Sequence, residues 1–209
     1  MTLIDVLMVV AAVMVIAVVL TLLLHKGLGR ARRITCINHL MQIGLSCRVW
    51  EGDRTNLYPM QVAGTNGGTM DFITGANAFR HFQVMSNELS TPHILICPAE
   101  SDRLRARAAN FDFLSNSNLS YFVGIDANET NPQMILSGDR NITNGTAVKN
   151  GLLNLTTNGP AGWTSEMHHD VGNIALADGS VRQVSRVGLR EVVVNTGLAT
   201  NRIQMPVLQ

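Results

Sequence analysis

Residues that could carry out acid–base chemistry gather near the C-terminus of the sequence. His168, His169, Asp170 and Asp178 lie within eleven residues, and Gly179 follows the last of them. Imidazoles and carboxylates are common general acids and bases and common metal ligands, so an enzyme is one hypothesis. The sequence contains no Gly-x-Ser-x-Gly, no His-Glu-x-x-His, no nucleotide-binding loop and no second cluster of candidate acids and bases. We therefore predict no catalytic or cofactor-binding residue and expect His168 to hydrogen-bond the backbone near a tight turn.

The three cysteines form no recognisable metal-binding pattern, because no Cys-x2-Cys or Cys/His pair occurs at ligand spacing. Cys36 and Cys47 are eleven residues apart. On a helix this spacing is about 16 Å, which exceeds the ~7 Å limit between the Cα atoms of a disulfide. The two residues cannot bond to each other within one helix. We expect the cysteines to be free buried thiols. The alternative is a disulfide from Cys36 or Cys47 to Cys97.

A second group of possible ligands is an acidic turn that contains Asp126, Asn128 and Glu129, together with the nearby Asp139. Their oxygen atoms suit calcium, but their spacing matches no calcium-binding loop. We expect solvated turn side chains and predict no metal site.

The N-terminal segment is long and apolar enough to cross a membrane. Residues 6–24 carry no charge, and Thr21 is the only polar side chain among them. A helix over residues 3–24 would be roughly 33 Å long, about the thickness of the bilayer hydrocarbon. A signal peptide would have a basic start, a shorter apolar core and a small-residue cleavage site, so we expect the segment to be retained. An ionised Asp5 in hydrocarbon costs at least ~2.5 kcal/mol without a partner, for which the α-amino group of Met1 in a neighbouring copy is the best candidate.

The charge gives no electrostatic case for a nucleic-acid partner. The formal net charge is +1, and the sixteen basic residues are spread along the chain. The only basic cluster follows the apolar segment, and the positive-inside tendency alone would place the C-terminal part in the cytoplasm. This cluster consists of Lys26, Arg30, Arg32 and Arg33. We interpret it as a solvated helix face or as a contact with lipid headgroups.

The remaining elements are predicted from periodicity and turn residues. Gly27 and Gly29 predict a hinge, and an apolar stripe over residues 31–50 predicts an amphipathic helix packed on a sheet. Asp178-Gly179 predicts a hairpin with a type I′ turn between strands 172–177 and 180–185. The other predicted elements are a helix over 76–89, strands over 93–97, 119–125, 133–137, 146–149 and 152–155, and a helix or strand over 189–195.

The N-terminus resembles a known family. Thr2-Leu-Ile-Asp5, followed by the apolar residues 6–11, is similar to the start of mature type IV pilins and type II secretion pseudopilins. Met1 stands where the family has Phe, and Asp5 where it has Glu. The resemblance implies that a prepilin peptidase produces Met1, that Met1 is N-methylated, and that Asp5 neutralises the amino terminus of the adjacent subunit. It also implies a removed basic leader that fixes the topology opposite to the positive-inside tendency.

Two further stretches resemble one group within this family. Residues 31–59 and the spacing His168-x9-Asp178-Gly179 are similar to the His-x9-Asp-Gly group of prepilin-type proteins from planctomycete and verrucomicrobial bacteria. With residues 2–11, the resemblance covers both ends of the chain and is weak in the middle.

These observations predict an α+β, type IV pilin-like fold with a long N-terminal helix on an antiparallel sheet. We expect a hydrophobic helix over residues 1–25, its amphipathic continuation over 26–52 and a globular head over 53–209. The predicted function is a structural subunit of a pilus or a secretion pseudopilus filament, extracellular or at the cell surface. Its partners would be identical subunits, the pilus or secretion assembly machinery, and the inner membrane before assembly. The alternatives are a membrane-anchored periplasmic enzyme and a non-polymerising interaction module that uses the region of His168 and Asp178.

Overall fold

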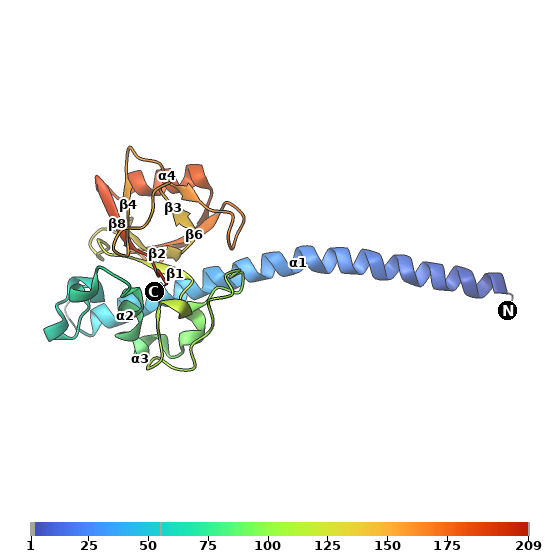
Figure 1. The fold of residues 1–209 in the computed structure, drawn as a ribbon, viewed down its shortest axis with the longest axis horizontal. Coiled ribbons are helices and arrows are strands. Elements are labelled where there is room, and N and C mark those ends of the chain that lie inside the picture. The colour runs from blue at the N-terminus through green and yellow to red at the C-terminus, as the bar shows by residue number, and fades with distance from the viewer. Residues whose placement is uncertain (1–2, 55, 209) are drawn as a thin grey trace.

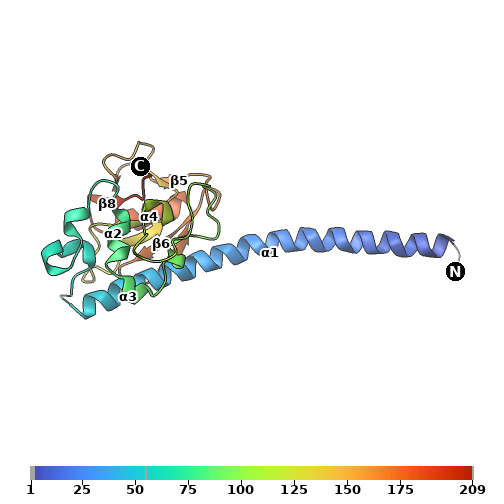
Figure 2. The same ribbon diagram turned by 60° about the horizontal axis from the view of Figure 1, so that its bottom comes forward.

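The computed structural model describes residues 3–54 and 56–208, apart from the side chains of residues 22–28. Its first element is helix α1 (Leu3–Gly52), a continuous α-helix of 50 residues. At about 1.5 Å per residue, α1 is roughly 75 Å long. Its first half projects away from the head, and the rest of the chain packs around its second half (Figures 1 and 2).

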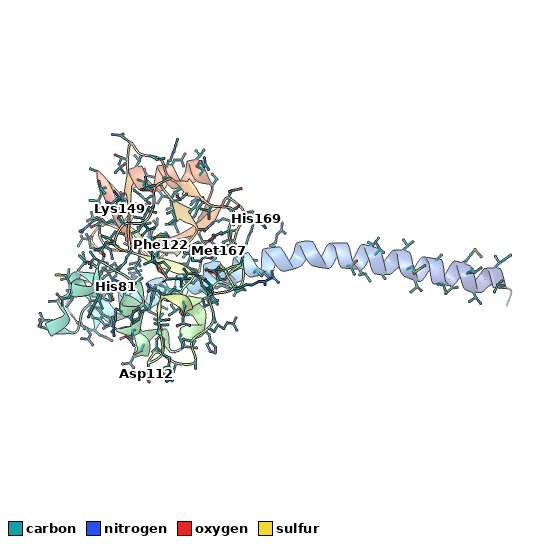
Figure 3. All side chains as sticks on the ribbon, in the orientation of Figure 1. His81, Asp112, Phe122, Lys149, Met167 and His169 are labelled. Atoms are coloured by element: carbon teal, nitrogen blue, oxygen red, sulfur yellow. A yellow bond between two sulfur atoms is a disulfide. The ribbon has the colours of Figure 1, made fainter. Side chains whose placement is uncertain are left out.

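No other element of the described chain covers the projecting half of α1. Leu3–Thr21 is long and apolar enough to cross a membrane, and none of this 19-residue segment is buried. Its side chains point outward on all sides (Figure 3). A core helix of a soluble protein would be covered, so this segment instead fits a membrane anchor or a signal sequence.

The predicted hinge at Gly27 and Gly29 is wrong, because α1 runs through both positions without a break. Each glycine weakens a helix by about 1 kcal/mol relative to alanine. Helix formation is cooperative, and turns on both sides continue the hydrogen-bond ladder, so two isolated glycines do not melt it.

Six antiparallel strands form the main sheet of the head, in the order β4-β8-β1-β2-β6-β7. The predicted α+β class with an antiparallel sheet is therefore confirmed. A second, two-stranded sheet pairs β3 with β5. The strands are β1 (Tyr121–Gly124), β2 (Ile135–Asp139), β3 (Ile142–Thr143), β4 (Leu152–Thr156), β5 (Gly162–Trp163), β6 (Gly172–Leu176), β7 (Val181–Val184) and β8 (Thr200–Gln204).

The main sheet is covered on both faces. Helix α1 packs on β2, β6 and β7 from one side, and helix α4 (Arg186–Asn195) lies on the other side with β3 and β5 (Figure 1). Along β6, Ile174 and Ala175 face the two different cores, so the strand is buried throughout. The predicted stripe of α1 is confirmed, since each member is at most 3% exposed: Cys36, Leu40, Ile43, Cys47 and Trp50.

Several short elements differ from the prediction. Residues 76–89 form two helices, α2 (Ala78–Gln83) and α3 (Ser86–Leu89). The predicted strand over 93–97 is wrong, because Pro92 presets a helical φ and starts a 3-10 helix, η4 (Pro92–Leu95). Residues 146–149 form no strand, and residues 189–195 belong to α4. The other 3-10 helices are η1 (Pro59–Gln61), η2 (Gly64–Asn66), η3 (Met70–Phe72) and η5 (Asn116–Asn118).

A buried histidine ties α2 to β8. His81 Nε2 lies 2.6 Å from Gln204 Oε1, and His81 Nδ1 lies 2.6 Å from Thr69 Oγ1. Gln204 Nε2 already donates to the carbonyls of Phe72 and Gly75, so its Oε1 must accept from His81. Thr69 then donates to Nδ1, and His81 is neutral. Burial lowers the pKa of His81 from 6.5 to about 4, although the bond to Gln204 acts in the opposite direction.

We predict that this histidine destabilises the head in acid. Between pH 6.5 and 4 the unfolded chain binds a proton at His81 that the folded chain does not, so the free energy of unfolding falls as the pH falls. From pH 7 to pH 4 the wild type should lose about 3 kcal/mol relative to His81→Gln. Urea unfolding of both chains across this range measures the difference. Equal pH slopes for the two chains would contradict the prediction.

Candidate functional site

The hairpin between β6 and β7 is present, but its turn is not type I′. The N–H of Gly179 donates to the carbonyl of Leu176, and the N–H of Leu176 donates to the carbonyl of Ser180. Gly179 has a φ of +82°, whereas Asp178 is not among the described residues with positive φ. The loop thus has three residues, with a type I turn followed by a left-handed glycine. Asp178 Oδ1 accepts a hydrogen bond from the N–H of Ser180 at 2.8 Å, which stabilises the turn.

The structure does not bring His168 and Asp178 together. His168 lies in the loop before β6 and Asp178 in the turn after it, and the five residues of β6 span roughly 17 Å at about 3.4 Å per residue. The spacing of the motif therefore describes a strand with its flanking turns, and the two side chains cannot act as an acid–base pair.

His168 lies in a buried cluster that the sequence did not suggest. Its Nε2 atom is 3.4 Å from Cys97 Sγ and 3.4 Å from Asp139 Oδ2. Cys97 is joined by a disulfide to Cys36 in α1, with 5.3 Å between their Cα atoms. Our expectation of free thiols is therefore wrong for these two cysteines, and only Cys47 remains a free buried thiol. The cause is tertiary packing, since α1 lies beside the segment that ends at Cys97.

The loop that carries His168 is closed by one side chain. Asn141 Nδ2 lies 3.1 to 3.2 Å from the carbonyls of Thr164, Glu166 and Val171 and donates to them. Within the loop three non-glycine residues have positive φ: Met167 at 60°, His169 at 54° and Asp170 at 61°. Such backbone is strained and persists only where the surroundings hold it.

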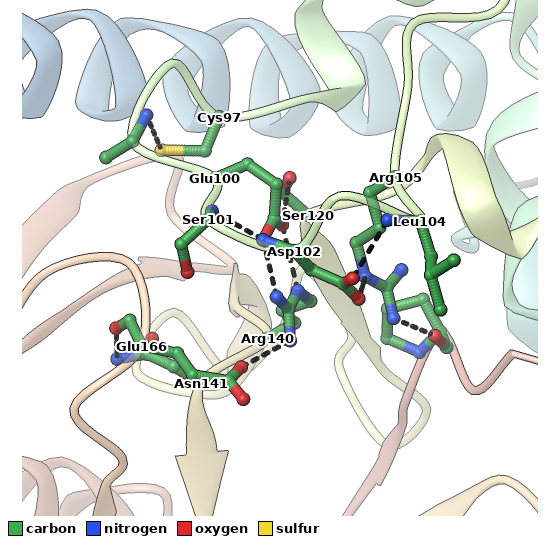
Figure 4. A network of polar contacts seen from close by, with 12 residues as sticks. Cys97, Glu100, Ser101, Asp102, Leu104, Arg105, Ser120, Arg140, Asn141 and Glu166 are labelled. Carbon is green, nitrogen blue, oxygen red and sulfur yellow. Dashed lines mark hydrogen bonds and ion pairs between the residues drawn. The ribbon is translucent and has the colours of Figure 1, made fainter.

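An ion-pair network joins this loop to the segment after Cys97 (Figure 4). Arg140 donates to both carboxylate oxygens of Glu100, at 2.8 and 2.5 Å, and to Glu166 at 2.6 Å. Burial alone would raise the pKa of Glu100, but Arg140, the N–H of Asp102 and the hydroxyl of Ser120 hold it below its usual value. The network therefore holds Glu100 ionised and fixes both loops around the disulfide.

The cluster itself favours uncharged groups. Burial raises the pKa of Asp139 to about 7, against hydrogen bonds from the backbone and side-chain nitrogens of Asn173. Burial, with the nearby charge of Arg33, lowers the pKa of His168 to about 4. At neutral pH the imidazole is thus neutral and can use a lone pair.

Cysteine, histidine and aspartate in contact resemble the parts of a nucleophilic site, but their arrangement does not fit one. In a catalytic relay one imidazole nitrogen faces the nucleophile and the other faces the carboxylate. Here the same atom, His168 Nε2, faces both Cys97 and Asp139, and the sulfur is bonded to Cys36. The geometry gives no support to acyl-transfer chemistry.

Both ends of the motif dock on α1 through main-chain carbonyls. The carbonyl of His168 accepts from Arg33 Nη2 at 3.3 Å, and that of Asp178 accepts from Arg48 Nη1 at 3.1 Å. A Cβ on Gly44 of α1 would lie 3.7 Å from the Cα of Gly179, so helix and turn approach closely. The motif thus holds β6 along about 22 Å of α1, counting fifteen residues at 1.5 Å each.

The other candidate residues are dispersed. Asp126 pairs with Arg202, while Glu129 lies 3.7 Å from Arg48. Asn128 accepts hydrogen bonds from its neighbours Thr130 and Asn131, as in an Asx turn, and Asp139 belongs to the buried cluster. The acidic turn therefore does not assemble these four residues into one site.

The predicted assembly residues lie at the tip of α1. Asp5 is in its first turn, and Met1 lies outside the described residues. The pairing of Asp5 with Met1 of another copy stays a prediction.

A cleft of about 800 Å³ opens where α1 leaves the head. Arg30, Arg32 and Arg33 line it from the helix, and His168 and Glu100 line it from the head. Three arginines of the predicted basic cluster thus lie near the buried cysteine cluster, whereas the side chain of Lys26 is outside the described part of the structure.

No protein-family model matches the chain, and the searches of curated proteins and of solved structures found no match either.

Proposed function

We propose that this chain is a membrane-anchored structural subunit that polymerises through α1 into a filament of the type IV pilus or type II secretion pseudopilus kind. The observation that carries the proposal is the 19-residue apolar segment Leu3–Thr21. It is uncovered along its whole length, and the same helix, α1, continues into the half that packs against the head. A filament subunit needs this arrangement: one rigid rod with an apolar half for its neighbours and an amphipathic half for its own head.

Assembly would transfer the apolar half of α1 from the lipid bilayer to a filament core. Apolar helices leave a bilayer only if other apolar surfaces replace the lipid, and identical helices can do so. Asp5 is the only charged residue in the segment Leu3–Thr21, so its carboxylate would be costly in an apolar filament core unless a cation compensates it. The amino terminus of Met1 in an adjacent subunit is the cation that we propose.

We predict that Asp5→Ala abolishes filaments and leaves membrane insertion intact. The substitution removes the charge that compensates the neighbouring amine, while it makes the segment more apolar and so favours insertion. Electron microscopy of sheared surface material measures filaments, and membrane fractionation measures insertion. Asp5→Glu retains the charge and should retain filaments, and Asp112→Ala in the exposed surface of the head is the matched control. Filaments of normal number from Asp5→Ala would instead favour a non-polymerising module or a different assembly contact.

A further inference from the structure

The disulfide cluster has the composition of a site for a thiophilic cation. In the described chain the sulfurs of Cys36 and Cys97 and one imidazole nitrogen of His168 all lie within 4.8 Å of one another, and all three residues are buried. They come from α1, from the segment after η4 and from the loop before β6, so sequence spacing could not indicate them. Once the disulfide is reduced, two thiolates and one neutral imidazole are ligands that Zn²⁺ prefers.

The distances agree with tetrahedral coordination. Bonds of about 2.0 Å to nitrogen and 2.3 Å to sulfur at a tetrahedral angle place the two ligand atoms roughly 3.5 Å apart. His168 Nε2 and Cys97 Sγ are 3.4 Å apart. The two sulfurs are closer together in the disulfide than they would be as ligands of one metal ion. They must therefore move apart when the disulfide is reduced and the ion binds.

A further candidate ligand stands beside His168. Asp139 is 0% exposed, and its Oδ2 atom lies 3.4 Å from His168 Nε2. Its Oδ1 atom has no hydrogen-bond partner among the described residues. A buried carboxylate oxygen without a partner is costly, and a bound cation would satisfy it. Asn173 holds the same carboxylate through two hydrogen bonds, as outer residues do around metal ligands.

We propose that the reduced chain binds one Zn²⁺ through Cys36, Cys97 and His168, with Asp139 available at the fourth position, and that disulfide formation releases the ion. The cleft lined by His168 gives the ion an entry path. The oxidant is a small-molecule or protein disulfide. It takes two electrons from the two thiolates and, with two protons, leaves as two thiols, while the protein gains one disulfide and loses the cation. This proposal goes beyond filament assembly and does not depend on it.

Cobalt tests the site directly. The full chain in detergent micelles is reduced with a phosphine, freed of reductant without oxygen and titrated with Co²⁺. We expect one Co²⁺ per chain, with a thiolate-to-cobalt charge-transfer band and the visible bands of tetrahedral cobalt, and displacement by Zn²⁺. The oxidised chain should show neither band. A reduced chain whose three cysteines all titrate as thiols after denaturation, and which shows no such bands, would overturn the proposal.

Variants identify the ligands. Cys36→Ala and Cys97→Ala should each lose the charge-transfer band of two-thiolate coordination, and His168→Gln should weaken Co²⁺ binding more than about tenfold. Cys47→Ala is the matched control, because it removes the one cysteine outside the cluster, and should bind as the wild type does. Loss of the bands in Cys47→Ala, or their persistence in both other cysteine variants, would refute the assignment.

A second measurement needs no variant. Oxidised glutathione added to the zinc-loaded chain should release one Zn²⁺ for each disulfide formed, as followed with a zinc-sensitive dye. Disulfide formation without release of zinc would contradict the proposed coupling.

Discussion

Reduction of the disulfide between Cys36 and Cys97 should lower the free energy of unfolding of the head by about 4 kcal/mol. The bond closes a loop with a sequence separation of 61 residues. In the loop-entropy description, releasing a loop of this length gives the unfolded chain that much additional freedom. The bond also joins the middle of α1 to the head, so we expect the helix around Cys36 to loosen first. Urea unfolding with and without a dithiol reductant, in the presence of a chelator, measures the loss.

Single-cysteine variants separate this effect from other consequences of the reductant. Without reductant, Cys36→Ala should already have the lower stability of the reduced wild type, and adding reductant should not change its unfolding midpoint. Cys47→Ala retains the disulfide, so reductant should destabilise it by the same amount as the wild type. A wild type whose midpoint does not move on verified reduction would show that the cross-link contributes little.

The second large effect should follow the loss of Arg140. We expect Arg140→Met to lower the free energy of unfolding by about 3 to 5 kcal/mol, because it leaves the carboxylate of Glu100 buried without its cation. The side chains of Arg140 and Glu100 are only 10% and 5% exposed. The loops that hold Cys97 and His168 should loosen as well, and hydrogen exchange over residues 97–102 and 164–171 would detect this.

An exposed ion pair in the same head provides the control. Arg202 is 48% exposed where it pairs with Asp126, so Arg202→Met should cost less than about 1 kcal/mol. If the two arginine variants lost the same stability, burial would not be the reason for the effect at Arg140.

Periodicity in the sequence predicted the elements that depend on local pattern. The stripe from Cys36 to Trp50 is buried as predicted, because a repeat of three and four residues can face only one side of a helix. Asp178-Gly179 predicted the hairpin, but not its three-residue loop, since the same dipeptide serves both turn types. The predicted strand over 93–97 was wrong because the prediction relied on the run of apolar residues, whereas Pro92 favours the start of a helix.

The candidate site could not be predicted, because its residues are distant in sequence. Cys36, Cys97, Asp139 and His168 meet only after α1, β2 and two loops have packed together. Four residues scattered over more than a hundred positions give no spacing to recognise, whereas His168 and Asp178, which share a motif, are held apart by β6. In this chain the motif reflects how β6 docks on α1, and the buried cluster forms from residues that are distant in the sequence.

We propose that the uncovered half of α1 becomes buried among identical helices in a filament. Electron cryo-microscopy of material sheared from cells that express the chain tests it most directly. We expect helical filaments in which residues 3–21 of neighbouring subunits form the core and each Asp5 faces the amino terminus of an adjacent subunit. Preparations that contain only dispersed particles, or filaments whose core lacks this segment, would contradict it.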